Sequence, residues 1–347
     1  MTRDGRTEGS SPKVVFAFDK FRGTASAAEL VAVGAGVADR LGWVSVQLPL
    51  ADGGEGSLEA VGGANKSTTV TGPAGTPVEA AWRMDGRSAF IEMAAASGLL
   101  LAGGAATNDP IAAGTWGTGQ LIATAVELGA RTVTVFLGGS ATTDGGLGAL
   151  DHLPTTARLK EIDLLIATDV TTTFVDAARV FGPQKGASAA EVELLERRLR
   201  RLAQMYAEDY GVDVVGVPGS GAAGGLAGGL LAVGGRIEPG FDVVAEWVGL
   251  DGHLEGADLI VTGEGFLDDE SFNGKVVGGV HQWADEQDVP VVAIVGDSDE
   301  VELPANMELV CLTERFGPAR SMAEPMALVA EVVADYLGGD MSPRRHK

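Results

Sequence analysis

Cysteine and histidine are scarce in this chain of 347 residues. The single cysteine, Cys311, lies in an apolar run, so no disulfide can form within the chain, and a cytoplasmic location is expected. The four histidines are scattered along the sequence and have no metal-ligand spacing with cysteine. The sequence therefore predicts neither a zinc site nor a catalytic triad built on histidine.

Basic residues are also few, with 25 lysines and arginines against 48 aspartates and glutamates, for a net charge of −23. A protein of that charge repels nucleic acid and anionic membranes, so neither is an expected partner. A small anionic substrate would need a local group of basic side chains. No apolar run is long enough to cross a bilayer, and the polar N-terminus has no signal-peptide core.

Aromatic residues make up only 5% of the chain, whereas it contains 51 glycines and is 45% hydrophobic. This composition is typical of many turns and of small-residue helices packed on strands. We expect an α/β fold with two domains: a doubly wound, mostly parallel sheet domain and a second α/β domain with some α+β character. The expected limits are 13–66 with 251–337 for the first, Rossmann-like domain, 67–250 for the second, and disordered tails at 1–12 and 338–347.

Apolar, β-branched runs predict the buried strands of a parallel sheet. Between residues 68 and 93, short alternating segments separated by glycine and proline turns predict antiparallel hairpins. Ser26, with Glu29 three residues later, predicts the start of a helix that runs to Arg40, and Thr118 is the expected cap of a second helix. The predicted buried strands are Lys13–Phe18, Val44–Leu50, Arg131–Leu137, Glu161–Ala167, Asp258–Thr262, Val289–Val295 and Met307–Leu312.

Charged residues and glycines follow several of these strands at the point where each ends. Open α/β sheets bind their ligands at the carboxyl ends of the strands, so these side chains are candidates for a site. The alternative is that they are charged loops that only aid solubility, or acidic turns before helices. The residues concerned are Asp19, Lys20 and Arg22, then Asp52, Gly53, Gly54 and Glu55, and finally Glu264, Asp268 and Lys275.

The turn after Arg131–Leu137 contains Gly138, Gly139, Ser140 and Asp144. A strand, a tight turn of small polar residues and a helix start can bind an anion through free backbone N–H groups. The turn is not a P-loop, because no Gly-Lys-Ser/Thr ends it. An ordinary strand–helix connection is the alternative.

Two further candidates lie between residues 168 and 187. Asp169 comes just past a predicted strand, where an aspartate suits a general base or a metal ligand but is also a common helix cap. Lys185 lies between a proline, which restricts the backbone, and a glycine, which leaves it free, and this suits a contact with phosphate or carboxylate. It could equally be a surface lysine in a turn.

A G-x-G-x-x-G pattern is formed by Gly219, Gly221 and Gly224, between a predicted short strand at Asp213–Val217 and a predicted helix at Leu226–Val233. This pattern raises the hypothesis of a nicotinamide-dependent dehydrogenase. It lies mid-chain, however, and no clean strand with a ribose-binding acid follows. We therefore favour a glycine loop that contacts phosphate or packs a helix closely.

Carboxylates, lysines and glycine loops together are typical of phosphoryl transfer, in which acids hold Mg²⁺ and lysines neutralise phosphate oxygens. On side-chain chemistry, Asp52, Glu55 and Glu264 are the candidate Mg²⁺ ligands. Asp169 is the candidate general base, and Lys20, Lys185 and Asp52 are the other candidate catalytic residues. The remaining strand-end and glycine-loop residues are candidates for substrate or nucleotide binding.

Several motifs resemble those of the bacterial glycerate kinases of the glycerate 2-kinase type, in the same order and over nearly the whole chain from residue 13. The resemblance implies phosphorylation of D-glycerate to 2-phosphoglycerate, dependent on ATP and Mg²⁺, by two α/β domains with the site in the cleft between them. The motifs are AFDKFRGTASAAE, LADGGEGSLEAV, IEMAAASGL, GTGQLI, GGSATTDGGLGAL, VFGPQKGA, GSGAAGGLAGGL and ADLIVTGEGFLD.

The chain departs from the pattern of that family at Thr143, Phe266 and Asn273, and in its short segment at Asp151–Lys160. These departures support a second hypothesis, that the protein is a non-catalytic or repurposed relative that binds a nucleotide or a small acid as a sensor or partner protein. The sequence identifies neither the acceptor nor the oligomeric state, and a homo-oligomer stays open.

Overall fold

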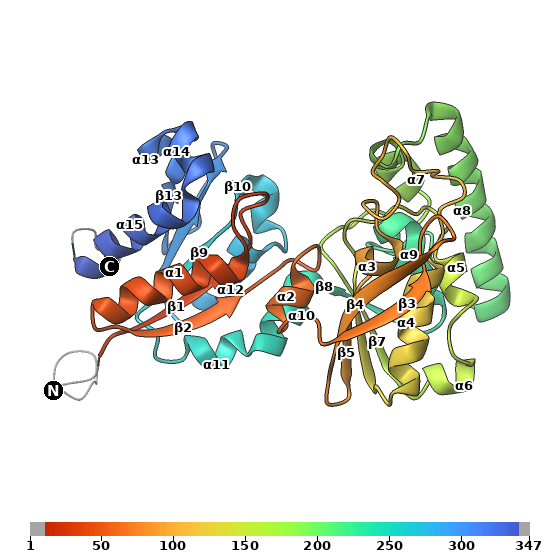
Figure 1. Cartoon of the computed structure of the whole chain (residues 1–347), viewed down its shortest axis with the longest axis horizontal. Helices are drawn as coiled ribbons and strands as arrows, with labels where there is room; N and C mark the ends of the chain where they lie inside the picture. The colour runs from red at the N-terminus through yellow and green to blue at the C-terminus, as the bar shows by residue number, and fades with distance from the viewer. Residues whose placement is uncertain (1–10, 340–347) are drawn as a thin grey trace. The chain divides into compact units, whose positions relative to one another are not determined.

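The structure, a computed structural model, describes residues 11–339, which divide into two compact units (Figure 1). Unit 1 contains the residues up to Asp52 and those from Val244 onward, and unit 2 is Gly53–Val243. These limits differ from those expected at 66/67 and 250/251. The loop after Asp52 belongs to unit 2 because the Glu92 carboxylate accepts hydrogen bonds from Gly56 N at 3.0 Å and Leu58 N at 2.8 Å. The expected disordered tails fall almost wholly outside the described residues.

Unit 1 is built on a five-stranded, fully parallel sheet of strand order β13-β11-β9-β1-β2. A short parallel pair, β10 with β12, lies beyond the ends of β9 and β11 in sequence. The strands are β1 (Lys13–Phe18), β2 (Val44–Pro49), β9 (Leu259–Gly263), β10 (Phe266–Leu267), β11 (Val291–Val295), β12 (Asp297–Ser298) and β13 (Met307–Cys311). The helices are α1 (Ala27–Arg40), α11 (Leu250–Leu254), η2 (Asp269–Phe272), α12 (Val276–Asp285), α13 (Leu312–Phe316), α14 (Pro318–Ala323) and α15 (Pro325–Gly338).

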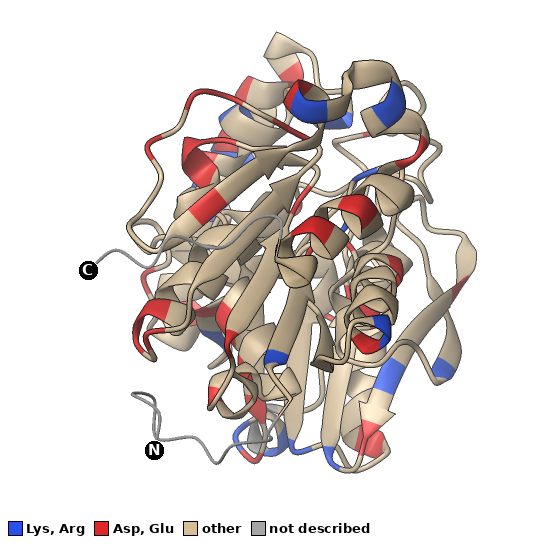
Figure 2. Ribbon diagram, turned by 90° about the vertical axis from the view of Figure 1, so that its left-hand side faces the viewer, with Lys and Arg blue, Asp and Glu red and all other residues tan. Residues whose placement is uncertain are grey.

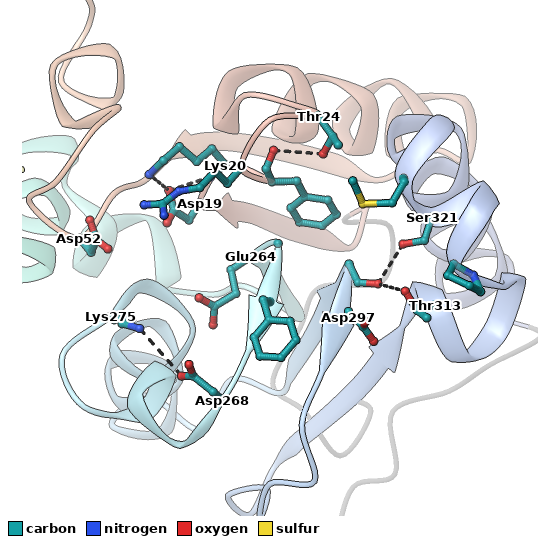
Figure 3. A pocket seen from close by; sticks show the side chains of 17 residues that line it. Asp19, Lys20, Thr24, Asp52, Glu264, Asp268, Lys275, Asp297, Thr313 and Ser321 are labelled. Atoms are coloured by element: carbon teal, nitrogen blue, oxygen red, sulfur yellow. Dashed lines mark hydrogen bonds and ion pairs between the residues drawn. The ribbon is translucent and has the colours of Figure 1, made fainter. Parts of the chain in front are cut away.

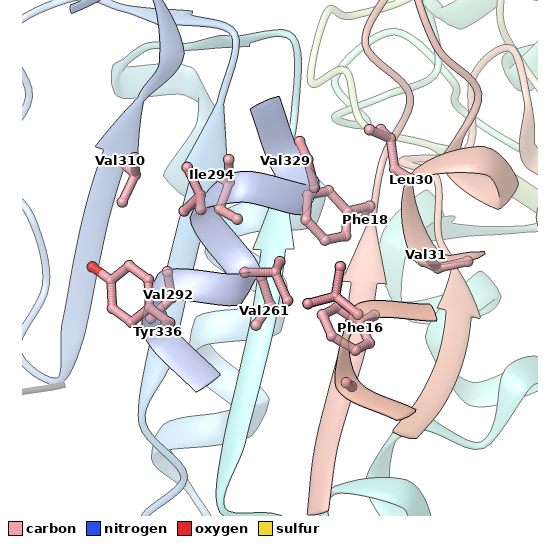
Figure 4. Packing of buried hydrophobic residues seen from close by; sticks show 14 of the residues in the cluster. Phe16, Phe18, Leu30, Val31, Val261, Val292, Ile294, Val310, Val329 and Tyr336 are labelled. Atoms are coloured by element: carbon pink, nitrogen blue, oxygen red, sulfur yellow. The ribbon is translucent and has the colours of Figure 1, made fainter. Parts of the chain in front are cut away.

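Helices cover both faces of this sheet. Phe16 and Phe18 of β1 pack in one cluster with Leu30 of α1 and Val329 of α15 (Figure 4). Val15, whose side chain points to the opposite face, is also fully buried, and α12 contacts β1, β9 and β11. Burial on both faces explains why these strands are continuous apolar runs in the sequence, and the prediction of a doubly wound parallel sheet is confirmed.

Unit 2 contains a six-stranded mixed sheet of order β3-β4-β5-β6-β7-β8. Its first three strands are antiparallel, which confirms the predicted hairpins, and β5 to β8 are parallel. The strands are β3 (Lys66–Thr71), β4 (Pro77–Asp85), β5 (Ser88–Glu92), β6 (Thr132–Phe136), β7 (Asp163–Thr168) and β8 (Arg236–Pro239). The helices are α2 (Ser57–Ala60), α3 (Ala94–Ser97), α4 (Trp116–Glu127), α5 (Leu147–Leu150), α6 (Thr156–Leu159), α7 (Ala177–Phe181), η1 (Pro183–Lys185), α8 (Ala189–Tyr210) and α9 (Ala222–Ala232), and α10 (Gly240–Val248) spans the boundary with unit 1.

Two local predictions are wrong. Residues 213–217 form no strand, because the Asp213 carboxylate accepts a hydrogen bond from Val215 N at 3.0 Å and the Ser220 hydroxyl donates to Val214 O at 2.9 Å, which turns the chain. Thr118 does not cap α4 but lies buried inside it, within 2.9 Å of the Ser97 hydroxyl. By contrast, the capping box that begins α1 is confirmed.

Within residues 11–339, every helix is too short or too polar to cross a lipid bilayer. Acidic residues are distributed over many elements, and the fewer basic residues lie among them (Figure 2). In so acidic a protein, a place where several basic side chains lie close together is therefore a candidate site for an anionic ligand.

Close backbone packing at the end of β9 gives a first prediction. A Cβ atom at Gly263 would lie 1.9 Å from Ile294 O and 2.8 Å from the Phe18 ring. We expect Gly263→Ala to lower the free energy of unfolding by about 1–3 kcal/mol, because neither neighbour can move without disturbing the sheet. Urea denaturation of the variant and the wild type measures this difference.

Gly252→Ala in α11 is the matched control, since a Cβ atom there would meet nothing within 4 Å. The control should leave stability unchanged or raise it slightly, as alanine usually does in a helix. Equal stability of the Gly263 and Gly252 variants would contradict the packing argument.

Candidate functional site

A pocket of about 420 Å³ lies within unit 1, at the carboxyl ends of β1 and β9 (Figure 3). The predicted site residues of this unit line it together: Asp19, Lys20, Arg22, Asp52, Glu264, Asp268 and Lys275. Sequence reasoning missed several other lining residues, namely Phe21, Thr24, Asp297, Thr313, Pro318, Ser321 and Met322. Asp297 follows β11 directly after a glycine, so the rule that selected the other strand ends could have found it.

Asp19 is held at the end of β1 by backbone and side-chain contacts. Its N–H donates to Gly263 O at 3.0 Å, and its Oδ1 accepts from Lys20 N at 2.7 Å. Burial raises the pKa of the Asp19 carboxyl to about 6; the Lys20 ammonium, 3.4 Å from Oδ1, opposes this shift, and Asp52 adds to it. Asp19 is therefore a desolvated carboxylate whose charge the Lys20 ammonium partly balances.

Glu264 extends from the end of β9 between two glycines. It is buried, and its Oε1 atom has no hydrogen-bond partner among residues 11–339. Burial raises the pKa of the Glu264 carboxyl to about 7; the nearby Ser271 and the charge of Lys275 lower it, whereas the charge of Asp19 raises it. Such an atom is costly to bury unless a cation or a proton satisfies it.

The three cations of the pocket differ in how they are paired. The Lys20 ammonium pairs with Asp19, and that of Lys275 lies 3.9 Å from Asp268 and 3.6 Å from Glu270. Arg22 is exposed and has no hydrogen bond or ion pair with any residue of the described part of the chain. Its guanidinium group is available for an anionic ligand, which it can bind through two parallel hydrogen bonds.

Formal charges of the lining favour a ligand that brings a cation with it. Five carboxylates (Asp19, Asp52, Glu264, Asp268 and Asp297) face three basic side chains (Lys20, Arg22 and Lys275). A bare polyphosphate would be repelled by this surplus of acid, whereas a polyphosphate accompanied by a divalent cation would not.

Mg²⁺ fits part of the donor set predicted for it. Asp52 and Glu264 both line the pocket, and Mg²⁺ ordinarily takes one or two carboxylates and completes its shell with water and substrate phosphates. The unpartnered Glu264 Oε1 is an atom that such a cation would satisfy. Glu55 belongs to unit 2 and does not line this pocket. Across residues 11–339, no three acidic, histidine or cysteine side chains are grouped so as to hold a metal by themselves.

Unit 2 contains the remaining candidates, in loops that pack closely on one another. A Cβ atom at Gly138 would lie 2.8 Å from Gly54 Cα, and one at Gly53 would lie 2.7 Å from Gly240 Cα. The glycines at these positions therefore permit contact between backbones, and Glu55 beside them is exposed. Glu92, which caps the start of α2, was not found from the sequence.

Asp144 and Lys185 are both buried in this unit. The Asp144 carboxylate accepts hydrogen bonds from Thr115 N and Oγ1, both at 2.9 Å, and from the N–H groups of Gly146 and Gly148. The Lys185 ammonium donates to Thr142 O at 2.7 Å. Burial lowers the pKa of Lys185 to about 7, although the charge of Asp144 opposes this shift. In this arrangement both side chains hold the loop 138–146 in place, and their contact with a ligand stays a prediction.

The G-x-G-x-x-G segment packs against that same loop. Gly224 has φ +69°, and a Cβ atom there would lie 2.0 Å from Thr142 O. At Gly221 a Cβ atom would lie 2.3 Å from Thr173 O. This close packing is one of the two alternatives that the sequence left open. Because residues 213–217 form no strand, the dinucleotide-binding arrangement lacks its first element.

Asp169 follows the last residue of β7 and is half-buried. Ser140 and Gly139 lie in the loop after β6, where Ser140 forms an isolated bridge with Gly98. The buried hydroxyls of Thr142 and Thr143 have no hydrogen-bond partner in the described part of the chain. These residues all belong to unit 2.

Comparison with known proteins identifies relatives over most of the chain. A sequence profile described as the glycerate kinase family matches residues 14–157 and 152–335. The chain is 38% identical over 330 residues to the glycerate 2-kinase of Escherichia coli K12, covering 83% of this chain and 86% of the relative. It is 37% identical over 329 residues to the glycerate kinase of Bacillus subtilis 168, covering 82% and 85%.

A solved structure is similar as well. The crystal structure of a protein from Salmonella typhimurium LT2, described as a candidate glycerate kinase 2, superposes with a TM-score of 0.78 at 32% sequence identity. The match covers 95% of this chain and the whole of the other.

The raised pKa of Glu264 predicts how a neutral substitute behaves. When the pKa of a carboxyl is higher in the folded than in the unfolded state, the free energy of unfolding of the protein falls as the pH rises, here from about 4.5 to about 7. Glu264→Gln has no carboxyl there to ionise and so lacks this fall. The free energy of unfolding of the variant minus that of the wild type should therefore be larger at pH 8 than at pH 5, by on the order of 2 kcal/mol. Denaturation in the presence of EDTA measures the difference.

Asp299→Asn, an exposed acid that follows β12, serves as the control and should give the same difference at both pH values. A stability difference for Glu264→Gln that does not change with pH would show that Glu264 is not desolvated as described.

Proposed function

Since the chain belongs to the glycerate kinase family and is a phosphotransferase enzyme, we propose that it transfers the terminal phosphoryl group of ATP to D-glycerate, giving 2-phosphoglycerate and ADP. The observation that supports this most is the match to named glycerate kinases over more than four-fifths of the chain. The pocket of unit 1, with its cations and desolvated acids at strand ends, supplies suitable chemistry.

In this proposal, Lys20, Arg22 and Lys275 bind the phosphate oxygens of the nucleotide. Asp52 and Glu264 would hold Mg²⁺, which would supply positive charge to offset the negative charge of the phosphates. In phosphoryl transfer, the negative charge of the transition state is spread over the phosphate oxygens. Cations that the fold already holds beside those oxygens stabilise this charge without moving, and this accounts for much of the rate enhancement.

Asp169 is the proposed general base. The acceptor hydroxyl gives its proton to the Asp169 carboxylate while its oxygen forms a bond to the terminal phosphorus of ATP, and the bond from that phosphorus to the bridging oxygen breaks to release ADP. Lys185 acts by fixing the loop 138–146 through Thr142 O. The N–H groups of Gly139 and Ser140 in that loop are proposed to bind an anionic group.

We also propose a cytoplasmic location.

Product identity is a direct test. Purified protein with ATP, Mg²⁺ and D-glycerate should release ADP, and the product should be converted by enolase without a phosphoglycerate mutase, because enolase acts on the 2-phosphate only. Formation of 3-phosphoglycerate would show that the hydroxyl on carbon 3 is phosphorylated instead of the one on carbon 2. ATP binding without turnover of any short hydroxy acid would favour a sensor protein instead.

Asp169→Asn tests the proposed base. The amide cannot accept the hydroxyl proton, so kcat with D-glycerate should fall by about 10²–10⁴-fold while KM for ATP stays within a few-fold. Asp209→Asn, an exposed acid on α8, is the control and should retain wild-type rates. Unchanged kcat in Asp169→Asn would remove this residue from the mechanism.

A further inference from the structure

The pocket of unit 1 is larger than a three-carbon acid requires, and its two ends differ. Pockets of about 300–1,000 Å³ hold molecules of drug or cofactor size, and this one is about 420 Å³. Figure 3 shows Lys20, Asp52 and Lys275 at one end and Asp297, Thr313 and Ser321 at the other. A ligand that fills the pocket therefore needs an anionic part and a second part of different chemistry.

The second end offers apolar surface with few free polar groups. Phe266 is 48% exposed and Met322 of α14 is 67% exposed, and both line the pocket, so two apolar side chains are accessible to a ligand there. The hydroxyls of Thr313 and Ser321 donate to Gly296 O at 2.8 Å and 2.9 Å, so the hydrogens of both are already used and neither can donate to a phosphate. This end suits a flat, neutral group rather than a phosphate.

One carboxylate stands beside this apolar surface. Phe266 and Asp297 are direct partners in the β10–β12 ladder, so their side chains lie next to each other. The ladder forms because Gly296 has no side chain: a Cβ atom there would lie 2.5 Å from Gly265 O. The exposed Asp297 Oδ1 accepts from Ser298 N, and the carboxylate retains lone pairs for a ligand that donates hydrogen bonds.

We propose that this end of the pocket is the adenine subsite of the enzyme, an inference that rests on ATP being the phosphoryl donor. The purine stacks on the exposed Phe266 ring with Met322 against it, and its exocyclic amine donates a hydrogen bond to the Asp297 carboxylate. The phosphates then extend toward Lys20, Arg22 and Lys275. Guanine presents a carbonyl oxygen where adenine has its amine, so the Asp297 carboxylate disfavours GTP.

Phe266→Ala tests the stacking contact. Loss of a base–aromatic stack should weaken the binding of Mg²⁺–ADP, measured by calorimetry, by roughly 10-fold. The same variant should raise KM for ATP similarly and leave KM for D-glycerate unchanged, which a general loss of structure would not do. Leu41→Ala, at an exposed residue of unit 1 outside the pocket, is the matched control and should bind as the wild type does.

Two further variants keep the test informative if Phe266→Ala is poorly folded. The Phe266→Trp variant retains a ring, so it should bind Mg²⁺–ADP and show a change in tryptophan emission that the wild type lacks. Asp297→Asn should lower the preference for ATP over GTP, because an amide can also donate to the guanine carbonyl oxygen.

The outcomes separate this inference from the proposed function. Wild-type turnover with ATP, together with unchanged nucleotide binding in Phe266→Ala and no emission change in Phe266→Trp, would overturn the subsite and leave the activity. Nucleotide binding that depends on Phe266, without turnover of D-glycerate, would support the subsite and overturn the proposed acceptor. A wild type that binds no adenine nucleotide would overturn both.

Discussion

Close contact between backbones at the ends of β9 and β11 is the constraint on which the pocket of unit 1 depends. Gly263 lies so close to Ile294 O, and Gly296 so close to Gly265 O, that neither position has room for a Cβ atom. This contact lets the chain continue from both strands as the short β10–β12 pair. Glu264, Phe266 and Asp297 consequently line one pocket, although Asp297 lies far from the other two in the sequence.

The electrostatics of the pocket follow from that packing. Strand ends buried by neighbouring backbone place Asp19 and Glu264 where water reaches them poorly, which raises the pKa of each. The excess of carboxylates over basic side chains then makes the pocket unsuited to a bare polyanion. This charge balance supports the proposal that the pocket takes a nucleotide together with its metal ion, which is how kinases ordinarily bind ATP.

Much of the fold could be predicted from the sequence, because parallel strands buried on both faces are continuous apolar runs; β1 was predicted with the limits it has. The segment 213–217 has a similar composition, but local hydrogen bonds of Asp213 and Ser220 turn it, and a composition-based argument does not weigh such contacts. Strand-end charges located Asp19 and Glu264. Lys185 was selected from the residues beside it in the sequence, but its burial depends on residues distant in the sequence, and its contact with a ligand stays a prediction. Met322 lies in α14, which has no sequence signal for a site.

The magnesium dependence of nucleotide binding tests the central claim most directly, that desolvated carboxylates at the strand ends require a cation to enter with the phosphates. ADP is titrated into the wild-type protein by calorimetry at pH 8, once with Mg²⁺ and once with EDTA. The account predicts clear binding with Mg²⁺ and a loss of at least about 10-fold in affinity with EDTA. Equal affinity under the two conditions would contradict it.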